Sequence, residues 1–420
     1  MDLKSFFSDA WNLKSFSCKS GEKKIFKLGD IPQLEHLSLN QLKWGNMKTD
    51  PFPWVTLKSL KIFDRIRFIV PQSLMEISSP YKAKVYPKYV KSIVINGPDE
   101  LVDIDATFPP PNVKELTITH LGNIGASYHQ LDLVKFCIGM NRTPFDSDLF
   151  TSFTHLTHLE ILKYHGNILS PGIFPQTITI MSIGCDFSIE CGVLPKSLKR
   201  LTFTKHFNSP LIPYSIPNGV EFIKLEVSGY KESIPNNVIP LSTKELHMTS
   251  RVIKPINAPP TTKINFYLKI IYRSVPEIPI YVTKFHFATT TVPLSEIKIP
   301  CSVTHLVLSH YNLSIQSKDI PDSVTILELP KRFTYIDARS IIPKNVRYLI
   351  IHSLCNISNI PDSVEYLMVR RNRNYKSTLD AQFPRGLKKL YIANYQYYFK
   401  NVPLSTILYP VPYRMKFKIN

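Results

Sequence analysis

The sequence predicts a repeat solenoid in which a parallel β-sheet forms one face and irregular or short helical (α or 3₁₀) segments return across the other. Three observations support this fold class. A proline-led phrase recurs every 18–23 residues, apolar and outward-facing residues alternate after each proline, and the 420-residue chain holds 34 prolines but only 14 glycines. Because 44% of the residues are hydrophobic, the chain is too apolar to be disordered, and frequent proline indicates regular punctuation.

The repeat is visible from the proline that begins each phrase. The pentapeptide IPDSV occurs at 320–324 and again at 360–364, and IPKNV at 342–346 stands between the two copies. The shared phrase is apolar–Pro–x–x–(Val/Leu)–x–x–(Leu/Ile/Phe)–x–apolar. Its prolines stand at positions 175, 195, 217, 240, 260, 279, 300, 321, 343, 361 and 384. Earlier copies include YPKYVKSIVI at 86–95 and PPPNVKELTI at 109–118. A period of this length indicates stacked structural units.

Each repeat predicts one short, half-buried strand. In SVTHLVLS (302–309), Leu306 and Leu308 alternate with His305 and Val307, and this period of two places the leucines on one face. The preceding proline fixes φ and lacks a backbone donor, which suits the corner where the chain turns into the sheet. Since a strand this short is unstable alone, we expect the repeats to stack their strands in parallel.

We expect one elongated domain, because no linker interrupts the repeats. The predicted segments are an N-terminal cap at 1–30, a single solenoid of roughly eighteen repeats at 31–410, and a basic C-terminal tail at 411–420. The repeats are most regular at 171–400.

The best repeats resemble a known family in their wording. Their V/L-x-x-L-x-L part is similar to the leucine-rich repeat, and the whole phrase resembles the FNIP repeat of social amoebae and giant viruses. Its I-P-x-S-V-x-x-L-x-apolar pattern is present as IPCSVTHLVL (299–308), IPDSVTILEL (320–329) and IPDSVEYLMV (360–369). The resemblance covers nearly the whole chain and is most specific between 278 and 392. It implies a leucine-rich-repeat-like solenoid that binds a partner.

The chain departs from the leucine-rich repeat at one structural position. In that family an asparagine stands eight residues after the first leucine of the consensus, and its side chain forms a ladder along the stack. The corresponding residues here are Tyr311, Arg332, Leu354 and Asn372. One asparagine in four predicts no such ladder, so the curvature of a standard horseshoe does not carry over.

Motif content favours a binding protein over an enzyme. No H-E-x-x-H, G-x-S-x-G, P-loop or G-x-G-x-x-G phrase occurs, and the six cysteines include no CxxC pair. We therefore expect no catalytic residues, no metal site and no cofactor. The sequence shows neither a signal-peptide pattern nor a stretch of eighteen apolar residues, which predicts a cytoplasmic protein with no membrane span.

The outward positions of the last well-formed repeats predict a binding face. The first outward position reads His305, Ile326, Tyr348, Tyr366 and Lys389, the second Val307, Glu328, Ile350, Met368 and Tyr391, and the third Ser309, Pro330, His352, Arg370 and Ala393. Tyrosines with apolar neighbours and a basic margin are typical of binding faces. The same residue types also suit strands for structural reasons alone, and that interpretation stays open for any single residue. The predicted partner-binding residues are Tyr348, Tyr366, Tyr391, Ile350, Met368, His352 and Lys389.

The formal net charge of +19 predicts an alternative function, in which the chain binds RNA or another anionic surface. Eleven Lys or Arg and only three acids lie between Pro361 and Asn420, so the charge is concentrated at one end. The anion-binding residues of this alternative are Arg370, Arg371, Arg373 and Lys376. The same charges would also keep the end of a solenoid soluble, and nucleic-acid-binding chains more often spread their charge along a whole face. We therefore expect a protein partner first.

Overall fold

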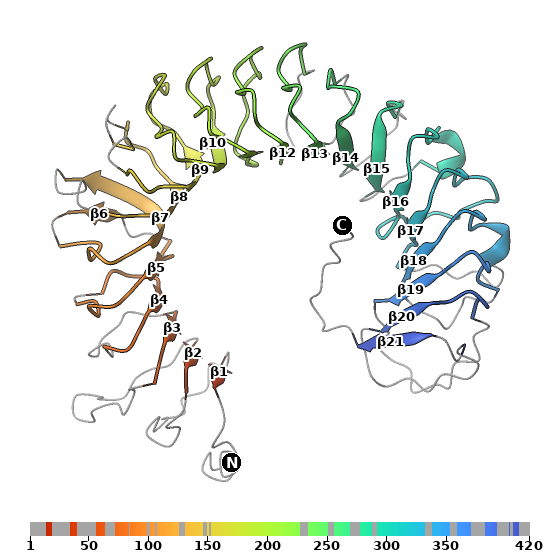
Figure 1. Cartoon of the computed structure of the whole chain (residues 1–420), viewed down its shortest axis with the longest axis horizontal. Helices are drawn as coiled ribbons and strands as arrows, with labels where there is room; N and C mark the ends of the chain where they lie inside the picture. The colour runs from red at the N-terminus through yellow and green to blue at the C-terminus, as the bar shows by residue number, and fades with distance from the viewer. Residues whose placement is uncertain are drawn as a thin grey trace, which may run out of the picture. The chain divides into compact units, whose positions relative to one another are not determined.

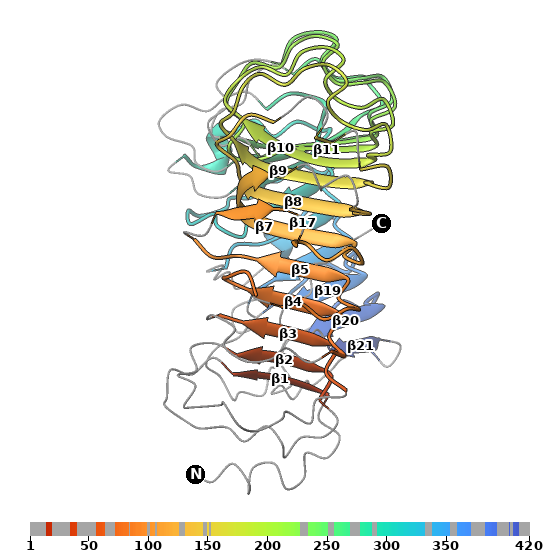
Figure 2. The same cartoon turned by 90° about the vertical axis from the view of Figure 1, so that its left-hand side faces the viewer.

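Short parallel strands, stacked in chain order, form the framework of the molecule in a computed structural model (Figures 1 and 2). The structure describes residues 14–18, 34–39, 56–63, 72–83, 85–98, 101–105, 107–125, 131–145, 149–150, 153–226, 234–250, 256–268, 278–287, 292–331, 338–352, 359–370, 383–392, 403 and 406–410. The chain divides into two units, Met1–Val220 and Glu221–Asn420.

The first unit contains one long parallel ladder. Its described strands are β1 (Ser15–Cys18), β2 (His36–Leu39), β3 (Ser59–Ile62), β4 (Glu76–Ser79), β5 (Ser92–Ile95), β6 (Val102–Ile104), β7 (Glu115–Ile124), β8 (Lys135–Met140), β9 (His158–Tyr164), β10 (Ile180–Cys185) and β11 (Arg200–Phe203). Each strand pairs in parallel with the next, except that β5 pairs with β7 and β6 pairs only with the far half of β7. Parallel pairing at every step requires the chain to return to the same end before each strand.

The second unit repeats this arrangement. Its described elements are β12 (Phe222–Leu225), β13 (Glu245–Ser250), β14 (Lys263–Leu268), β15 (Val282–Phe287), η3 (Leu294–Glu296), β16 (His305–Val307), β17 (Ile326–Glu328), η4 (Ala338–Ser340), β18 (Tyr348–Ile351), β19 (Tyr366–Val369), β20 (Lys389–Ile392) and β21 (Ile407–Pro410). Consecutive strands from β12 to β21 pair in parallel. In the described return segments only η3 and η4 are helical, and both are 3₁₀ turns. The predicted solenoid, with a parallel sheet on one face and irregular or 3₁₀ returns, is confirmed.

A tight turn that begins at the repeat proline precedes each regular strand. The proline C=O accepts a hydrogen bond from the N–H three residues later, as in Val303 N to Pro300 O at 3.0 Å, and the same bond recurs in both IPDSV copies. Proline suits this place because the turn needs its carbonyl and makes no use of the N–H that it lacks. The predicted corner is confirmed. In the repeat before β14 the turn begins at Pro259, whose carbonyl accepts a hydrogen bond from Thr262 N at 3.0 Å. The prediction that Pro260 is the repeat proline of this turn is therefore wrong.

Hydroxyl side chains link successive repeats at the turn before the strand, a different place from the asparagine ladder of the leucine-rich repeat. In six described repeats, a Ser or Thr directly before the inward Val, Leu or Ile donates its hydroxyl to the backbone carbonyl of the corresponding inward residue one repeat earlier. These bonds are Thr56 to Leu34 (3.1 Å), Ser73 to Leu57 (2.8 Å), Thr177 to Leu156 (2.7 Å), Ser197 to Ile178 (2.6 Å), Ser302 to Val282 (3.0 Å) and Ser323 to Val303 (2.8 Å). The serine of the repeated phrase thus satisfies a carbonyl at the entrance to the sheet.

Tyr311 shows what occupies one of the missing asparagine positions. The ring is buried, and its hydroxyl accepts a hydrogen bond from Leu294 N (2.9 Å) and donates one to Ser314 O (3.3 Å). Tyr311 therefore holds the return segment by hydrogen bonds from its side chain to the backbone, as the asparagine of a leucine-rich repeat would. The other three positions, Arg332, Leu354 and Asn372, lie outside the described residues.

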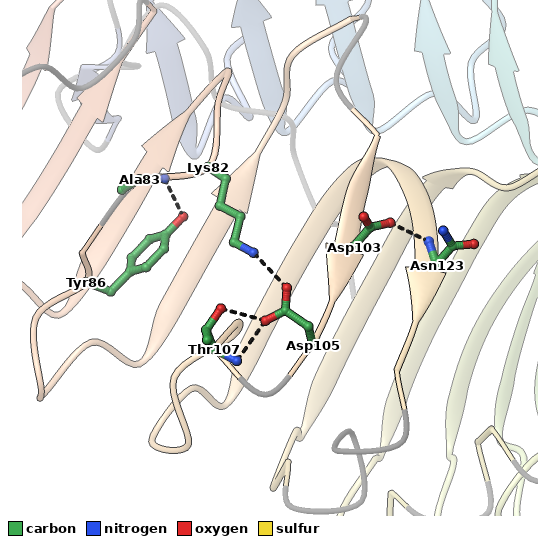
Figure 3. A network of polar contacts seen from close by, with 7 residues as sticks. All are labelled: Lys82, Ala83, Tyr86, Asp103, Asp105, Thr107 and Asn123. Atoms are coloured by element: carbon green, nitrogen blue, oxygen red, sulfur yellow. Dashed lines mark hydrogen bonds and ion pairs between the residues drawn. The ribbon is translucent and has the colours of Figure 1, made fainter.

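Strand β6 is an extra element of the first unit, held by a polar network (Figure 3). Asp105 accepts hydrogen bonds from Thr107 N (2.7 Å) and Thr107 Oγ1 (2.6 Å) and pairs with Lys82 Nζ at 3.3 Å. Asp103 accepts from Asn123 N at 2.6 Å, which ties β6 to the end of β7. The Thr107 hydrogen bonds, helped by Lys82, lower the pKa of Asp105 to about 2. These contacts fix a return segment.

The ends of the repeat array overlap the predicted cap and tail only in part. Strand β1 lies inside the 1–30 segment and already pairs with β2, so the ladder includes part of the region expected to act as a cap. The tail at 411–420 and most of 1–30 lie outside the described residues, and those boundaries stay predictions.

Candidate binding face

The outward side chains of the second unit form an aligned surface because parallel pairing keeps the strands in register. Along β16–β20 one row holds His305, Ile326, Tyr348, Tyr366 and Lys389, and the next holds Val307, Glu328, Ile350, Met368 and Tyr391. This is the register predicted from the repeat phrase. The inward residue between the two rows is a fully buried leucine in every one of these strands. The sheet therefore presents the two rows to one side and its core to the other.

Two tyrosines stack on neighbouring strands at the centre of this face. The rings of Tyr348 and Tyr366 lie with their centroids 4.3 Å apart and their planes within 5° of parallel. Lys389 continues the row, and its ammonium lies 5.9 Å from the Tyr366 ring centroid. All three side chains are half-buried, so each keeps part of its surface open to solvent. An aromatic pair of this kind stabilises a sheet by about 0.5–1.5 kcal/mol beyond its buried area.

Ile350 and Met368 form the apolar floor of the neighbouring row. They are 8% and 5% exposed, and the half-buried ring of Tyr391 packs against the cluster that they form. Side chains this buried offer a partner little area of their own. Of these three residues, Tyr391 carries the accessible surface, and the other two hold it in place.

A buried carboxylate borders the same floor. Glu328, only 4% exposed, accepts hydrogen bonds at one oxygen from Arg370 Nη1 (2.8 Å) and His352 Nε2 (3.0 Å). A buried charge persists only when it is paired, so this three-residue cluster is a structural feature of the face. The sequence prediction included Arg370 and His352 but missed Glu328. A lone acid between Val307 and Ile350 in an otherwise apolar outward row was the available signal.

Neutral histidines occupy the face on the side of β15 and β16. Lys284 of β15 lies in register with His305, and the rings of His286 and His305 are 6.1 Å apart. Burial, with the Lys284 cation as a second cause, lowers the pKa of His286 to about 4 and that of His305 to about 3. Burial also lowers the pKa of Lys284. Near neutral pH both imidazoles are therefore uncharged hydrogen-bonding groups.

The basic cluster predicted for anion binding is described only at its first residue. Arg370 directly follows β19 and is paired with Glu328. Arg371, Arg373 and Lys376 lie outside the described residues. In the part of the chain that the structure describes, no three histidine, cysteine or acidic side chains are arranged to hold a metal ion. Among the same residues, no helix has the length and apolar character needed to cross a membrane.

Comparison with known proteins identifies the repeats. The model of the FNIP Repeat family matches residues 188–228 and 311–354. A Dictyostelium discoideum protein, the probable serine/threonine-protein kinase fnkE, is 43% identical over 61 residues, which amount to 14% of this chain and 5% of that relative. The chain thus carries FNIP repeats in these two segments, and it spans only a small part of the curated relative that it matches.

Solved structures resemble the chain over most of its length at low identity. TLR13, solved as a complex with ssRNA13, is 14% identical, with a TM-score of 0.53 over 91% of this chain and 68% of that one. CroV588, described as a novel circular LRR protein, is 17% identical, with a TM-score of 0.44 over 92% of this chain and 64% of that one. At 14% identity, the likeness to TLR13 bears on the fold alone. The fold is a leucine-rich-repeat-like solenoid.

Proposed function

We propose that this FNIP-repeat chain is a non-catalytic protein-interaction scaffold that binds a partner protein through the outward face of β18–β20. The contact residues are Tyr348, Tyr366, Tyr391 and Lys389, with Ile350, Met368 and His352 as their support. The observation that carries the proposal is the aligned tyrosine pair, whose rings lie 4.3 Å apart on neighbouring strands.

Rigid aromatic side chains support a binding role for physical reasons. Tyrosine offers a large contact area, and stacking has already restricted the freedom of both rings, so binding orders them at little further entropic cost. The Lys389 ammonium adds a positive charge beside the tyrosines. Aromatic residues and arginine are the residue types most enriched in binding hot spots.

The test replaces Tyr348, Tyr366 and Tyr391 together with alanine. Loss of hot-spot residues costs about 2 kcal/mol or more, so partner capture should fall by about 30-fold or more. The readout is quantitative mass spectrometry of proteins captured from lysate by the wild-type and variant chains, followed by titration of the purified partner. Far-UV circular dichroism checks that the variant keeps its fold.

The matched control replaces Tyr89 and Tyr214 with alanine. Both are exposed tyrosines of the first unit, at 63% and 66%, and neither lies on the proposed face. The control should capture the partner as the wild type does. Equal capture by the triple variant and the wild type would refute the assignment of this face.

The alternative function is RNA or anionic-surface binding by Arg370, Arg371, Arg373 and Lys376. Its support is the net charge of +19 and the concentration of cations after Pro361. The Glu328 carboxylate already neutralises much of the Arg370 charge, which favours the protein partner at this residue. Salt separates the two functions, because nucleic-acid affinity falls by orders of magnitude between low and physiological salt. A labelled single-stranded RNA titrated at two salt concentrations provides the measurement.

A further inference from the structure

An exposed apolar stripe runs along one edge of the second unit. It consists of the residue directly after the repeat proline in four successive turns, and we name it the corner stripe: Leu241, Pro260, Ile280 and Cys301. The four turns have the same geometry, because in each the proline carbonyl accepts an N–H at 3.0–3.1 Å. The four residues therefore occupy equivalent positions at the entrances to strands β13, β14, β15 and β16.

The exposure of this stripe is unusual for apolar side chains. Leu241 is 84% exposed and Ile280 is 80% exposed, and Pro260 and Cys301 are also exposed. Because β13 to β16 pair in sequence, the four side chains follow one another at about the spacing of neighbouring strands, 4.8 Å. They form a continuous apolar line.

The same turn position is polar in most other repeats. Exposed charged or amide residues occupy it in eight described turns, and Pro111 occupies it in one. The eight are Lys88, Gln176, Lys196, Asn218, Asp322, Lys344, Asp362 and Arg385. The turn itself therefore does not require an apolar residue. Contiguous exposed apolar side chains of this kind mark interaction sites.

The spacing of the corner stripe selects the kind of segment that fits it. An α-helix presents side chains of one face about every 5.4 Å along its axis, close to the strand spacing of about 4.8 Å. Same-face residues of an extended strand are about 6.6 Å apart, and those of a polyproline II helix about 9.3 Å apart. Of these three conformations, only the α-helix can place one apolar side chain against each residue of the corner stripe.

The charged residues near the corner stripe indicate which residues should stand beside the apolar face of that helix. Exposed lysines stand three residues from three of the stripe positions, at Lys244, Lys263 and Lys298. Lys244 pairs with Glu221 at 2.7 Å, and its side chain is 72% exposed. A second copy of this chain would bring the same lysines and its own net charge of +19 to the contact. Acidic residues beside the apolar face of the partner would instead be attracted.

We propose that the corner stripe binds an amphipathic α-helix of a partner protein, with acidic residues beside the apolar face of that helix. The stripe shares no residue with the tyrosine face, so this inference stands independently of the function proposed above. The helix lies across the entrances of β13–β16 and sets its leucine-type side chains against Leu241, Pro260, Ile280 and Cys301.

The experiment uses synthetic peptides of about 18 residues, long enough to form a helix. One carries leucines at helical spacing with glutamates beside them. A second has the same composition with the leucines alternating, and a third replaces the glutamates with lysines. Fluorescence anisotropy with the full chain should show the first peptide binding at least about tenfold more tightly than either of the others.

Two variants connect this binding to the stripe. Leu241→Ser with Ile280→Ser should weaken binding of the helical peptide by at least about tenfold. Their high exposure means that the fold should tolerate both changes. Gln176→Ser with Asn218→Ser, at the same turn position in the first unit, should leave binding unchanged. Equal binding of the alternating peptide, or no effect of the stripe variant, overturns the proposal. A dimer in sedimentation that the stripe variant abolishes would assign the stripe to a second copy and also overturns it.

Discussion

Glu328 offers a sharp test of how the binding face is held together. The change Glu328→Gln removes a charge and keeps the side-chain volume. The wild-type carboxylate accepts Arg370 Nη1 at 2.8 Å and His352 Nε2 at 3.0 Å at a site that is 4% exposed. The glutamine carbonyl oxygen can still accept both hydrogen bonds, because both donors contact the same carboxylate oxygen, but neither bond is then made to a charged acceptor. The variant therefore weakens both bonds and leaves the Arg370 guanidinium without its counter-charge.

The magnitude follows from the burial of each partner. A hydrogen bond to a charged group contributes about 1.5–3 kcal/mol, and one between neutral groups about 0.5–1.5 kcal/mol. Weakening two such bonds by about 1 kcal/mol each should lower the local free energy of unfolding of Glu328→Gln by about 2 kcal/mol. Arg370 is 37% exposed, and solvent screens its half of the pair. Arg370→Met should therefore cost about 1 kcal/mol. The double variant should cost less than the sum of the two, by a coupling of about 1 kcal/mol.

Hydrogen exchange is the suitable assay, because long repeat arrays lose two-state unfolding behaviour. The amides to follow are Leu329 N and Arg370 N, which bond to Ile350 O and Ile351 O at 2.9 Å each. A local loss of about 2 kcal/mol corresponds to exchange about 30-fold faster there. Strands β2–β5 of the first unit serve as the internal control. Unchanged exchange at β17–β19, or costs that simply add in the double variant, would refute the paired-carboxylate interpretation.

Two further predictions follow from the same unit. The pKa of His286 lies at about 4 and that of His305 at about 3, against 6.5 in the unfolded chain. The contribution of the two residues to the free energy of unfolding is therefore full above pH 6.5, and it is lost as the pH falls toward 4 for His286 and toward 3 for His305. The loss of stability is about 3 kcal/mol for His286. Replacing both histidines with asparagine should therefore make the urea midpoint depend less steeply on pH. A variant whose urea midpoint depends on pH as steeply as that of the wild type would contradict the burial argument. The two IPDSV copies provide a matched pair, because the Ser323 hydroxyl donates to Val303 O at 2.8 Å, whereas the buried Ser363 hydroxyl has no partner among the described residues. In hydrogen exchange of the following strand, Ser323→Ala should cost about 1 kcal/mol and Ser363→Ala nothing, and equal costs would show that the hydroxyl ladder contributes no stability.

The sequence predicts the framework well because the repeat phrase records backbone requirements. A proline three residues before an inward Val or Leu marks the corner, and the alternation after it fixes the register. Strand β3 was not predicted, because Pro53 stands four residues before Leu57 and the phrase is displaced. Strand β4 was missed because its last inward position holds a serine. That residue, Ser79, is buried and donates its hydroxyl to Tyr81 O at 2.5 Å.

The binding face is less predictable because its behaviour depends on contacts between repeats. The register placed Tyr348 beside Tyr366 correctly, but it did not reveal that Ile350 and Met368 are nearly covered. The two side chains form one buried cluster, and the ring of Tyr391 packs against it. The pairing of Glu328 with Arg370 joins residues 42 positions apart across two repeats. Such diagonal contacts depend on side-chain length and direction, which a pattern of apolar positions does not encode.

The repeat separates the positions that build the solenoid from those that are free to vary. The turn uses the proline carbonyl and a backbone N–H, and the hydroxyl ladder uses one side chain in each of the repeats that have it. Neither constrains the outward strand residues or the residue after the proline. The tyrosine face and the corner stripe each occupy one of these unconstrained positions; the face lies on strands β18–β20, and the stripe lies in the turns before β13–β16. A substitution at one surface therefore leaves the framework and the other surface intact, so the two proposed contacts can be tested separately in one chain.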